Sequence, residues 1–305
     1  MRTRTLGQGG PVVSVVGLGT NNFGTRCDYE QTRAVIDAAL DVGITLFDTA
    51  DIYGQGASEE FIGRALEGRR DRVVIATKFG KPMDDRPSER RGSREYVRWA
   101  VEGSLRRLRT DVIDVYQMHE PDPGTPIEET LGALDELVRE GKVRFVGSSN
   151  FDVAQIEEAD RVARDRGLAR FVAAQNRYSL VRREAEDDLL PACERLGIGV
   201  LPYFPLEGGL LTGKYVRGVE PTEGRLAQRP DWLTDEAFDC VDALRRFADE
   251  RGVSLLEVAV GGLLAMPAVT SVIAGATRPE QVRANAAAGA WEPSEDDVVA
   301  LRALR

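Results

Sequence analysis

Short apolar runs rich in β-branched residues alternate along the chain with longer stretches in which apolar residues recur at helical spacing. The short runs predict strands, which begin near Val15, Ile44, Val73, Val112, Val143, Phe171, Gly199 and Val269. The stretches between them predict helices, most clearly at 32–40, 96–108, 131–138 and 154–162. Most strand-helix pairs occupy about 30 residues, the size of one βα unit of a parallel sheet.

A hairpin is expected before the first of these units. Residues 3–6 and 12–14 have strand character, and the glycines of segment 7–10 supply a turn. Eight parallel units that close on themselves form a barrel, whose bottom the hairpin would close. We therefore predict an α/β protein with a (β/α)8 TIM-barrel fold, an N-terminal β-hairpin and long loops after strands 3 and 7. No linker or shift in composition divides the chain, so one domain over residues 1–305 is expected.

A dinucleotide-binding Rossmann unit is the rival layout. A Gly-Leu-Gly sequence at 17–19 follows the first strand, and Asp48 ends the second. The third glycine is misplaced, because Gly24 gives the spacing GxGxxxxG and the next helix starts only around Glu30. The count of eight units favours the barrel.

Charge and cysteine usage narrow the class of protein. A net charge of −10 and a pI near 4.9 argue against a nucleic-acid partner or an anionic membrane surface. No apolar run reaches about 18 residues, and the N-terminus lacks the apolar core of a signal peptide. Cys27, Cys193 and Cys240 are widely separated, which indicates a reducing cytoplasm and no structural zinc. We expect a cytoplasmic protein without a metal; its oligomeric state is not predicted.

Residues able to do proton chemistry fall where predicted strands end. Asp48 and Tyr53 follow the second strand, Lys78 ends the third, and His119, the only histidine, follows the fourth. In a barrel these ends build the active site. Taken singly, each residue could be structural: a satisfied histidine, a rim ion pair or a half-buried tyrosine. Because all four residues fall on the same rim of the predicted barrel, a catalytic site is favoured over four separate structural roles.

These four residues suit the reduction of a carbonyl group. Hydride addition leaves an oxygen that needs a proton and a donor that stabilises its growing charge. Tyr53 can donate, although a free phenol has a pKa of about 10. We expect the Lys78 cation to lower that pKa and Asp48 to hold the lysine. His119 can orient the carbonyl oxygen or assist the proton relay.

Several motifs resemble those of the aldo-keto reductase family, in the family's order. They are DTADIYG at 48–54, ATKFG at 76–80, MH at 118–119, GSSNF at 147–151, LPYFPL at 201–206 and GATRPEQ at 275–281. The resemblance runs from the N-terminal hairpin to about Asn285. It implies a catalytic tetrad of Asp48, Tyr53, Lys78 and His119, with Tyr53 as general acid.

The resemblance also implies NADPH (NADP) as cofactor and a small-molecule carbonyl substrate. Ser149, Asn150 and Gln175 would fix the nicotinamide carboxamide, and Tyr203 would stack on the ring. The other expected cofactor contacts are Gly19, Thr20, Asn21, Pro205, Leu206, Gly208, Gly209, Lys214, Arg225, Gly275, Thr277, Arg278, Gln281 and Asn285. A flexible surface insertion is the alternative for the glycine-rich stretch 206–214.

The segment after the eighth strand is expected to select the cofactor's phosphate. It starts a helix, where backbone N–H groups favour an anion. By resemblance this region holds the adenosine 2′-phosphate, so Thr277 and Arg278 favour NADPH over NADH. Gly275 and Ala284 stand where some relatives have lysine and glutamate, so the contacts with the 2′-phosphate and the adenine are expected to differ. A solvated charge at a helix start is the alternative for Arg278.

The leading hypothesis is an NADPH-dependent oxidoreductase that reduces aldehydes or ketones to alcohols. Two alternatives stay open: a keto-sugar or sugar-nucleotide reductase of secondary metabolism, and a slow-turnover, NADP-binding redox-sensing regulatory protein. Loop sequence does not fix loop shape, so the substrate cannot be read. Phe23, Phe79 and Phe204 are candidate walls of the substrate pocket.

Overall fold

A closed ring of parallel strands forms the centre of the molecule. The computed structural model describes residues 1–83 and 90–304, and its eight-stranded sheet has the order β10-β3-β4-β5-β6-β7-β8-β9. The strands are β3 Val16–Gly19, β4 Leu46–Asp48, β5 Val74–Phe79, β6 Ile113–Met118, β7 Val143–Ser149, β8 Phe171–Gln175, β9 Gly199–Val200 and β10 Val272–Gly275. Backbone hydrogen bonds from Thr270 to Val200 (2.9 Å) and from Ile273 to Pro202 (3.2 Å) link the segments of β9 and β10. The predicted (β/α)8 barrel is confirmed.

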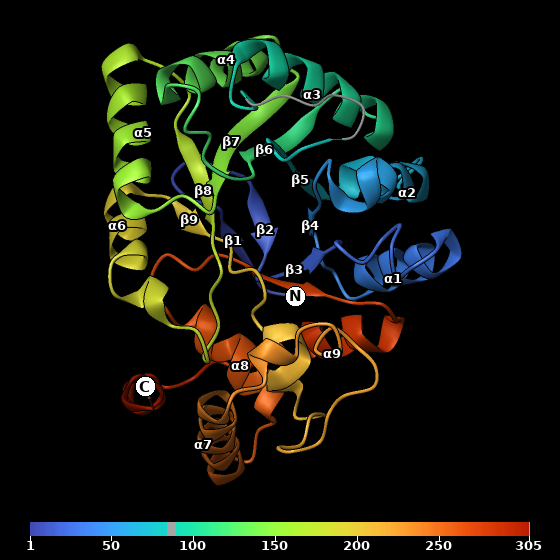
Figure 1. The fold of residues 1–305 in the computed structure, drawn as a ribbon, viewed down its shortest axis with the longest axis vertical. Helices are drawn as coiled ribbons and strands as arrows, with labels where there is room; N and C mark the ends of the chain where they lie inside the picture. Colours follow the sequence, from blue (N-terminus) through green and yellow to red (C-terminus); the bar gives the residue numbers. More distant parts are fainter. Residues whose placement is uncertain (84–89, 305) are drawn as a thin grey trace.

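Helices surround the ring of strands (Figure 1). They are α1 Tyr29–Asp41, α2 Ala57–Ala65, α3 Arg94–Leu108, α4 Ile127–Arg139, α5 Val153–Arg166, α6 Leu189–Leu196, α7 Asp235–Arg251, α8 Leu255–Leu264, α9 Pro279–Ala288 and α10 Glu295–Ala303. Local signals fix several ends: Asp28 and Asp152 close capping boxes with glutamines three residues later. In the described part of the chain, no helix is long and apolar enough to cross a membrane.

The N-terminal hairpin closes one end of the barrel. Strand β1, Thr3–Thr5, pairs antiparallel with β2, Val12–Ser14, as predicted. Figure 1 shows the hairpin across the centre of the ring. Leu6 and Val13 are fully buried in one apolar cluster, whose other members are Leu46, Ala76, Val115, Ala173, Leu201 and Ile273. The hairpin therefore completes the packing of the barrel interior.

Two long loops follow β5 and β9, as expected. The second carries short 3-10 helices at Glu207–Thr212 and Pro230–Trp232 before α7 begins. Strand β9 has two residues, where the apolar run predicted a longer strand to 203. Pro202, which has no N–H to donate, accounts for this early end. Residues 84–89 of the first loop, and Arg305, lie outside the described residues.

Candidate active site

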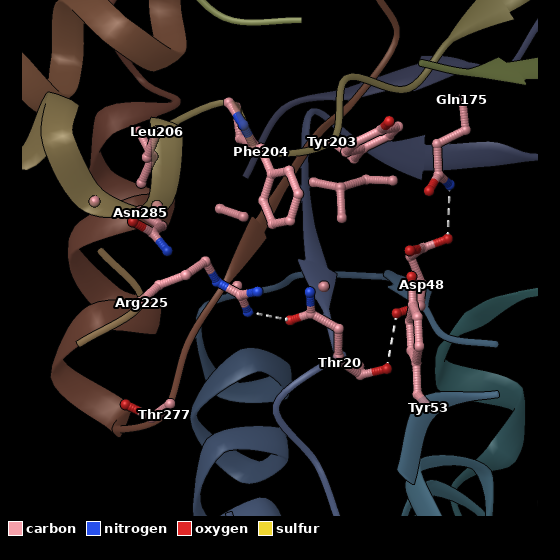
Figure 2. Close-up of a pocket in the computed structure, with 18 of the residues that line it drawn as sticks. Thr20, Asp48, Tyr53, Gln175, Tyr203, Phe204, Leu206, Arg225, Thr277 and Asn285 are labelled. Carbon is pink, nitrogen blue, oxygen red and sulfur yellow. Dashed lines mark hydrogen bonds between the residues drawn. The ribbon is translucent and has the colours of Figure 1, made fainter. Parts of the chain in front are cut away.

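The carboxyl ends of the strands surround a pocket of about 580 Å³, a size suited to a small-molecule ligand. Tyr53 and Asp48 lie at one side of it, and Arg225, Thr277 and Asn285 lie at the other (Figure 2). The predicted residues that line it are Gly19, Thr20, Asn21, Asp48, Tyr53, His119, Ser149, Asn150, Gln175, Tyr203, Phe204, Pro205, Leu206, Gly208, Gly209, Lys214, Arg225, Gly275, Thr277, Gln281 and Asn285.

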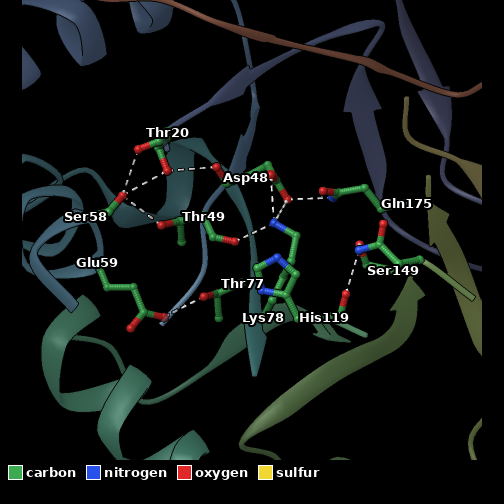
Figure 3. Close-up of polar contacts among 11 residues, drawn as sticks. Thr20, Asp48, Thr49, Ser58, Glu59, Thr77, Lys78, His119, Ser149 and Gln175 are labelled. Carbon is green, nitrogen blue, oxygen red and sulfur yellow. Dashed lines mark hydrogen bonds and ion pairs between the residues drawn. The ribbon is translucent and has the colours of Figure 1, made fainter. Parts of the chain in front are cut away.

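Lys78 and Asp48 form a buried ion pair beside the pocket (Figure 3). The Lys78 Nζ donates to both Asp48 carboxylate oxygens at 2.9 Å and to the Thr49 carbonyl at 2.7 Å. Burial alone would lower the pKa of Lys78, but the Asp48 carboxylate and Tyr53 outweigh it and raise that pKa. Lys78 is therefore a cation with a fixed position.

Tyr53 begins the 3-10 helix Tyr53–Gly56, and its ring lies close to the Lys78 side chain of the Asp48–Lys78 pair. The Lys78 Nζ is 5.1 Å from the centre of its ring. Burial raises the pKa of the Tyr53 phenol, and the opposing effect of Lys78 is smaller, so the net direction is upward. Lys78 does lower the pKa of Tyr53, as expected, but the net shift is upward because burial, which the sequence does not show, has the larger effect. Tyr53 is thus a protonated donor at neutral pH.

His119 is neutral and held in place next to Tyr53. Burial, with Lys78 and Lys81 nearby, lowers the pKa of His119 from 6.5 to about 2. The imidazole meets the Tyr53 ring edge-on, with centroids 5.9 Å apart. Its backbone N–H donates to Phe79 at 2.8 Å, and its carbonyl accepts from the Asn150 amide at 2.8 Å. A neutral imidazole keeps one N–H to donate.

The single imidazole should not titrate between pH 5 and 9. The folded-state pKa lies below the unfolded value of about 6.5, so acid favours the unfolded chain, and folding loses about 2 kcal/mol by pH 5. His119→Gln removes this pH dependence. When the pH falls from 8 to 5, the free energy of unfolding of the variant should therefore rise by about 2 kcal/mol relative to that of wild type. Proton NMR of the imidazole and denaturant unfolding at both pH values measure this. An imidazole midpoint near 6.5 would contradict the buried neutral form.

A polar cluster connects the tetrad to β7 and β8. The Gln175 side-chain amide donates to Asp48 at 2.8 Å, and Asn150 donates to the Ser149 hydroxyl at 3.1 Å. Asn150 also accepts from the Tyr203 hydroxyl at 2.7 Å. Its φ of 61° is left-handed, a conformation that asparagine tolerates better than most residues. Among the described residues, these contacts leave the Gln175 side-chain carbonyl and the Ser149 O–H available to a carboxamide.

The opposite side of the pocket offers cations. The Arg225 guanidinium donates to Asn21 at 3.0 Å and to Asn22 at 3.1 Å. Burial, and then Arg26, lowers the pKa of Arg225. Neither Arg225 nor Lys214 forms an ion pair with a carboxylate within the described ranges. This donor set, beside the tight backbone of Gly208 and Gly209, fits the phosphates of a dinucleotide.

The start of α9 differs in part from the expectation. The Gln281 side-chain carbonyl accepts from the Thr277 N–H at 2.8 Å and hydroxyl at 3.2 Å. Asn285 is buried and lines the pocket. Arg278 is the residue before α9, is exposed and is not part of the pocket lining. Its role toward a phosphate stays a prediction.

Two of the three predicted pocket phenylalanines belong to the core. Phe23 and Phe79 have no exposed surface, and Phe79 stacks on Tyr116 with centroids 4.7 Å apart. Phe79 follows Lys78 on β5, so it points to the opposite face of the strand, toward the helices. Placing Phe23 and Phe79 on the substrate wall is therefore wrong. Phe204 does line the pocket, with a strained φ of 51°.

Some pocket residues were not predicted. Arg26 lies in the loop before α1 and donates across the pocket to the Gly224 carbonyl at 2.9 Å. Lys81 lines the pocket and pairs with Glu120 at 3.5 Å. Arg26 belongs to no motif, whereas Lys81 is one of the chain's few lysines, and that rarity was a usable signal. Across the described residues, no cluster of His, Cys, Asp or Glu could hold a metal ion.

A barrel with a buried lysine–aspartate pair, a protonated tyrosine and a neutral histidine around one pocket defines a site for carbonyl-alcohol chemistry. The chain matches the aldo/keto reductase family over residues 15–305. It belongs to this family and is an oxidoreductase. Members typically depend on NAD(P)H.

Several relatives align with this chain over most of their own length. An uncharacterized oxidoreductase, YrpG, of Bacillus subtilis is 41% identical over 91% of this chain and 88% of its own length. An L-glyceraldehyde 3-phosphate reductase of Escherichia coli is 34% identical over 93% and 86%. A probable voltage-gated potassium channel subunit beta of Oryza sativa is 35% identical over 93% and 90%.

Proposed function

We propose that this protein is an NADPH-dependent reductase of aldehydes or ketones, with Tyr53 as the general acid. The observation that carries the proposal is the Asp48–Lys78 pair, with Tyr53 and His119 beside it at the pocket. A bound nicotinamide cofactor would supply the hydride, and the protein supplies placement and electrostatics. We also propose that residues 1–305 form one domain and act in the cytoplasm.

Each of the four residues, Asp48, Tyr53, Lys78 and His119, has a separate role in protonating the carbonyl oxygen. Tyr53 donates its phenolic proton to the oxygen that becomes the alcohol. Lys78, fixed by Asp48, stabilises the phenolate that remains. His119 orients the oxygen through its neutral N–H, which avoids a second buried cation. Proton transfer of this kind contributes typically 10²–10⁴-fold to the rate.

The pocket wall offers partners for each part of the cofactor. Ser149, Asn150 and Gln175 would hold the carboxamide, with Tyr203 against the ring. The pyrophosphate would be held by Lys214, Arg225 and the backbone at 208–209. Further contacts would come from Gly19, Thr20, Asn21, Pro205, Leu206, Gly275, Gln281 and Asn285.

Turnover with a panel of carbonyl compounds tests the proposal. The expected result is NADPH oxidation with at least one class of aldehyde or ketone. The panel includes triose phosphates, because one relative is named for a phosphorylated aldehyde, and keto-sugars for the second alternative. NADPH binding without turnover above background would instead favour the regulatory alternative, which the channel-subunit relative keeps open.

Arg278→Ala should weaken NADPH binding by about 1.5–3 kcal/mol, the range for a hydrogen bond to a charged group, and leave NADH almost unchanged. Arg278 stands at the N-terminus of α9, where the helix dipole also favours an anion. Arg283→Ala, another exposed arginine on α9, is the matched control. Titration of both cofactors gives the affinities. Equal losses for NADPH and NADH would remove Arg278 from the 2′-phosphate site.

A further inference from the structure

A second group of buried ionisable residues lies next to the strand that carries Lys78. Asp51 is 1% exposed and stands two residues before Tyr53, in the turn after β4. Its backbone N–H donates to the Lys78 carbonyl at 3.1 Å. The turn that carries the proton donor is thus tied to the strand that carries the lysine. Glu59, on α2, is fully buried in the same region.

The carboxyl groups here outnumber the cations. Asp48 is paired with Lys78. Glu59 accepts from Arg107 at 2.7 Å and from the Thr77 hydroxyl at 2.5 Å (Figure 3 shows the Thr77 contact). Asp51 forms no ion pair within the described residues. Two cations therefore face three buried carboxyl groups.

The contacts of Asp51 show which of the three lacks compensation. Its Oδ1 accepts only from the Ile52 N–H, at 2.6 Å, and its Oδ2 is buried without a partner among the described residues. The free-energy cost of burying an unpaired carboxylate is high enough that such a group keeps its proton instead. Asp51 is the one carboxyl of the cluster in that position.

The groups around Asp51 act on its pKa in opposite directions, and those that raise it outweigh the others. They come from α2, α3, β5 and β6, as Glu59, Arg107, Lys78 and the Tyr116 phenol. Burial, and then Glu59, raises the pKa of Asp51 well above its usual range, against smaller opposing effects of the Ile52 N–H, Arg107 and Lys78. The Tyr116 hydroxyl is also buried without a partner in the described structure, and burial followed by Asp51 raises its pKa.

We propose that Asp51 is a positioning residue that works as a neutral carboxylic acid and, in that form, sets the strength of Tyr53 as a proton donor. This step rests on the proposed function. After Tyr53 donates, its phenolate depends on the nearby Lys78 cation for stabilisation. An ionised Asp51 would place another negative charge near Lys78, raise the free energy of the phenolate that this cation stabilises, and weaken the donor.

Asp51→Asn tests the proton directly, because an amide keeps the acceptor for Ile52 and carries no charge. The matched control is Asp135→Asn, which changes another buried aspartate, one that pairs with Arg139 at 2.8 Å on α4. Infrared spectra of the apoprotein at pH 7 should show a protonated-carboxyl band in wild type and in the control. The band should be missing in Asp51→Asn.

Unfolding gives a second readout that needs no substrate. An unfolded aspartate loses its proton above about pH 4, while the folded Asp51 keeps it, so rising pH favours the unfolded wild type. The unfolding constant of wild type, relative to Asp51→Asn, should therefore rise about 100-fold between pH 5 and 7. The same comparison of wild type with Asp135→Asn should show no such rise, because both proteins contain Asp51.

The pH dependence of kcat tests the link to Tyr53. Over the pH range in which wild type loses its protonated-carboxyl infrared band, kcat for carbonyl reduction should fall more steeply in wild type than in Asp51→Asn, with the same KM for NADPH. Parallel kcat profiles through the pH at which wild type loses the band, an infrared band that survives in Asp51→Asn, or failure of Asp51→Asn to fold where the control folds would each overturn the proposal. If wild type reduces no carbonyl compound, the proposed function fails instead, and the infrared and unfolding data still decide where the proton lies.

Discussion

Tyr53→Phe should lower the rate of carbonyl reduction by about 10²–10⁴-fold while NADPH binds with nearly unchanged affinity. The substitution keeps the ring that packs edge-on against His119 and removes only the O–H. The high pKa of Tyr53 means that wild type carries this proton at neutral pH, so its loss is felt at once.

Two measurements check this result. Cofactor titration and single-turnover rates separate binding from chemistry, and Tyr29→Phe, on α1, controls for loss of a phenol elsewhere. Near-wild-type turnover in Tyr53→Phe would show that another group is the acid.

Lys78→Met should destabilise the protein and abolish most of its activity. It leaves the Asp48 carboxylate buried without its cation, and breaking such a pair costs about 3–5 kcal/mol. The activity falls separately, because the Tyr53 phenolate loses the charge that stabilises it.

A double variant separates these two effects. Asp48→Asn with Lys78→Met removes both charges and should recover much of the stability, as measured by denaturant unfolding, but none of the activity. Recovery of activity together with stability would make the pair a structural feature of the barrel rim and nothing more.

Much of the barrel could be predicted because its strands are short apolar runs with clear boundaries. The positions of the polar rim residues could be predicted for the same reason: Asp48, Lys78 and His119 occur where those runs end. The alternation of side chains along β5 decides which face of the strand each residue occupies, and the apolar run alone does not show this. It turns Lys78 inward and Phe79 outward, so the expectation for Phe79 failed.

The remaining errors concern quantities that depend on tertiary contacts. The direction of the Tyr53 pKa shift depends on how deeply the phenol is buried, which the sequence does not show. The Arg26–Gly224 contact joins loops 198 residues apart, so no local pattern signals it. The excess of carboxyl groups around Asp51 likewise arises only when α2 and α3 pack against the strands.

The most direct test of the central claim follows hydride and proton in a single turnover. Enzyme saturated with NADPH that carries deuterium at both C4 positions of the nicotinamide is mixed with an aldehyde that the panel identifies, and the alcohol is analysed by mass spectrometry. The account predicts one deuterium on the carbinol carbon for each cofactor oxidised, at a rate that Tyr53→Phe reduces by at least about 100-fold. Bound cofactor that stays reduced, or alcohol without deuterium, would contradict it.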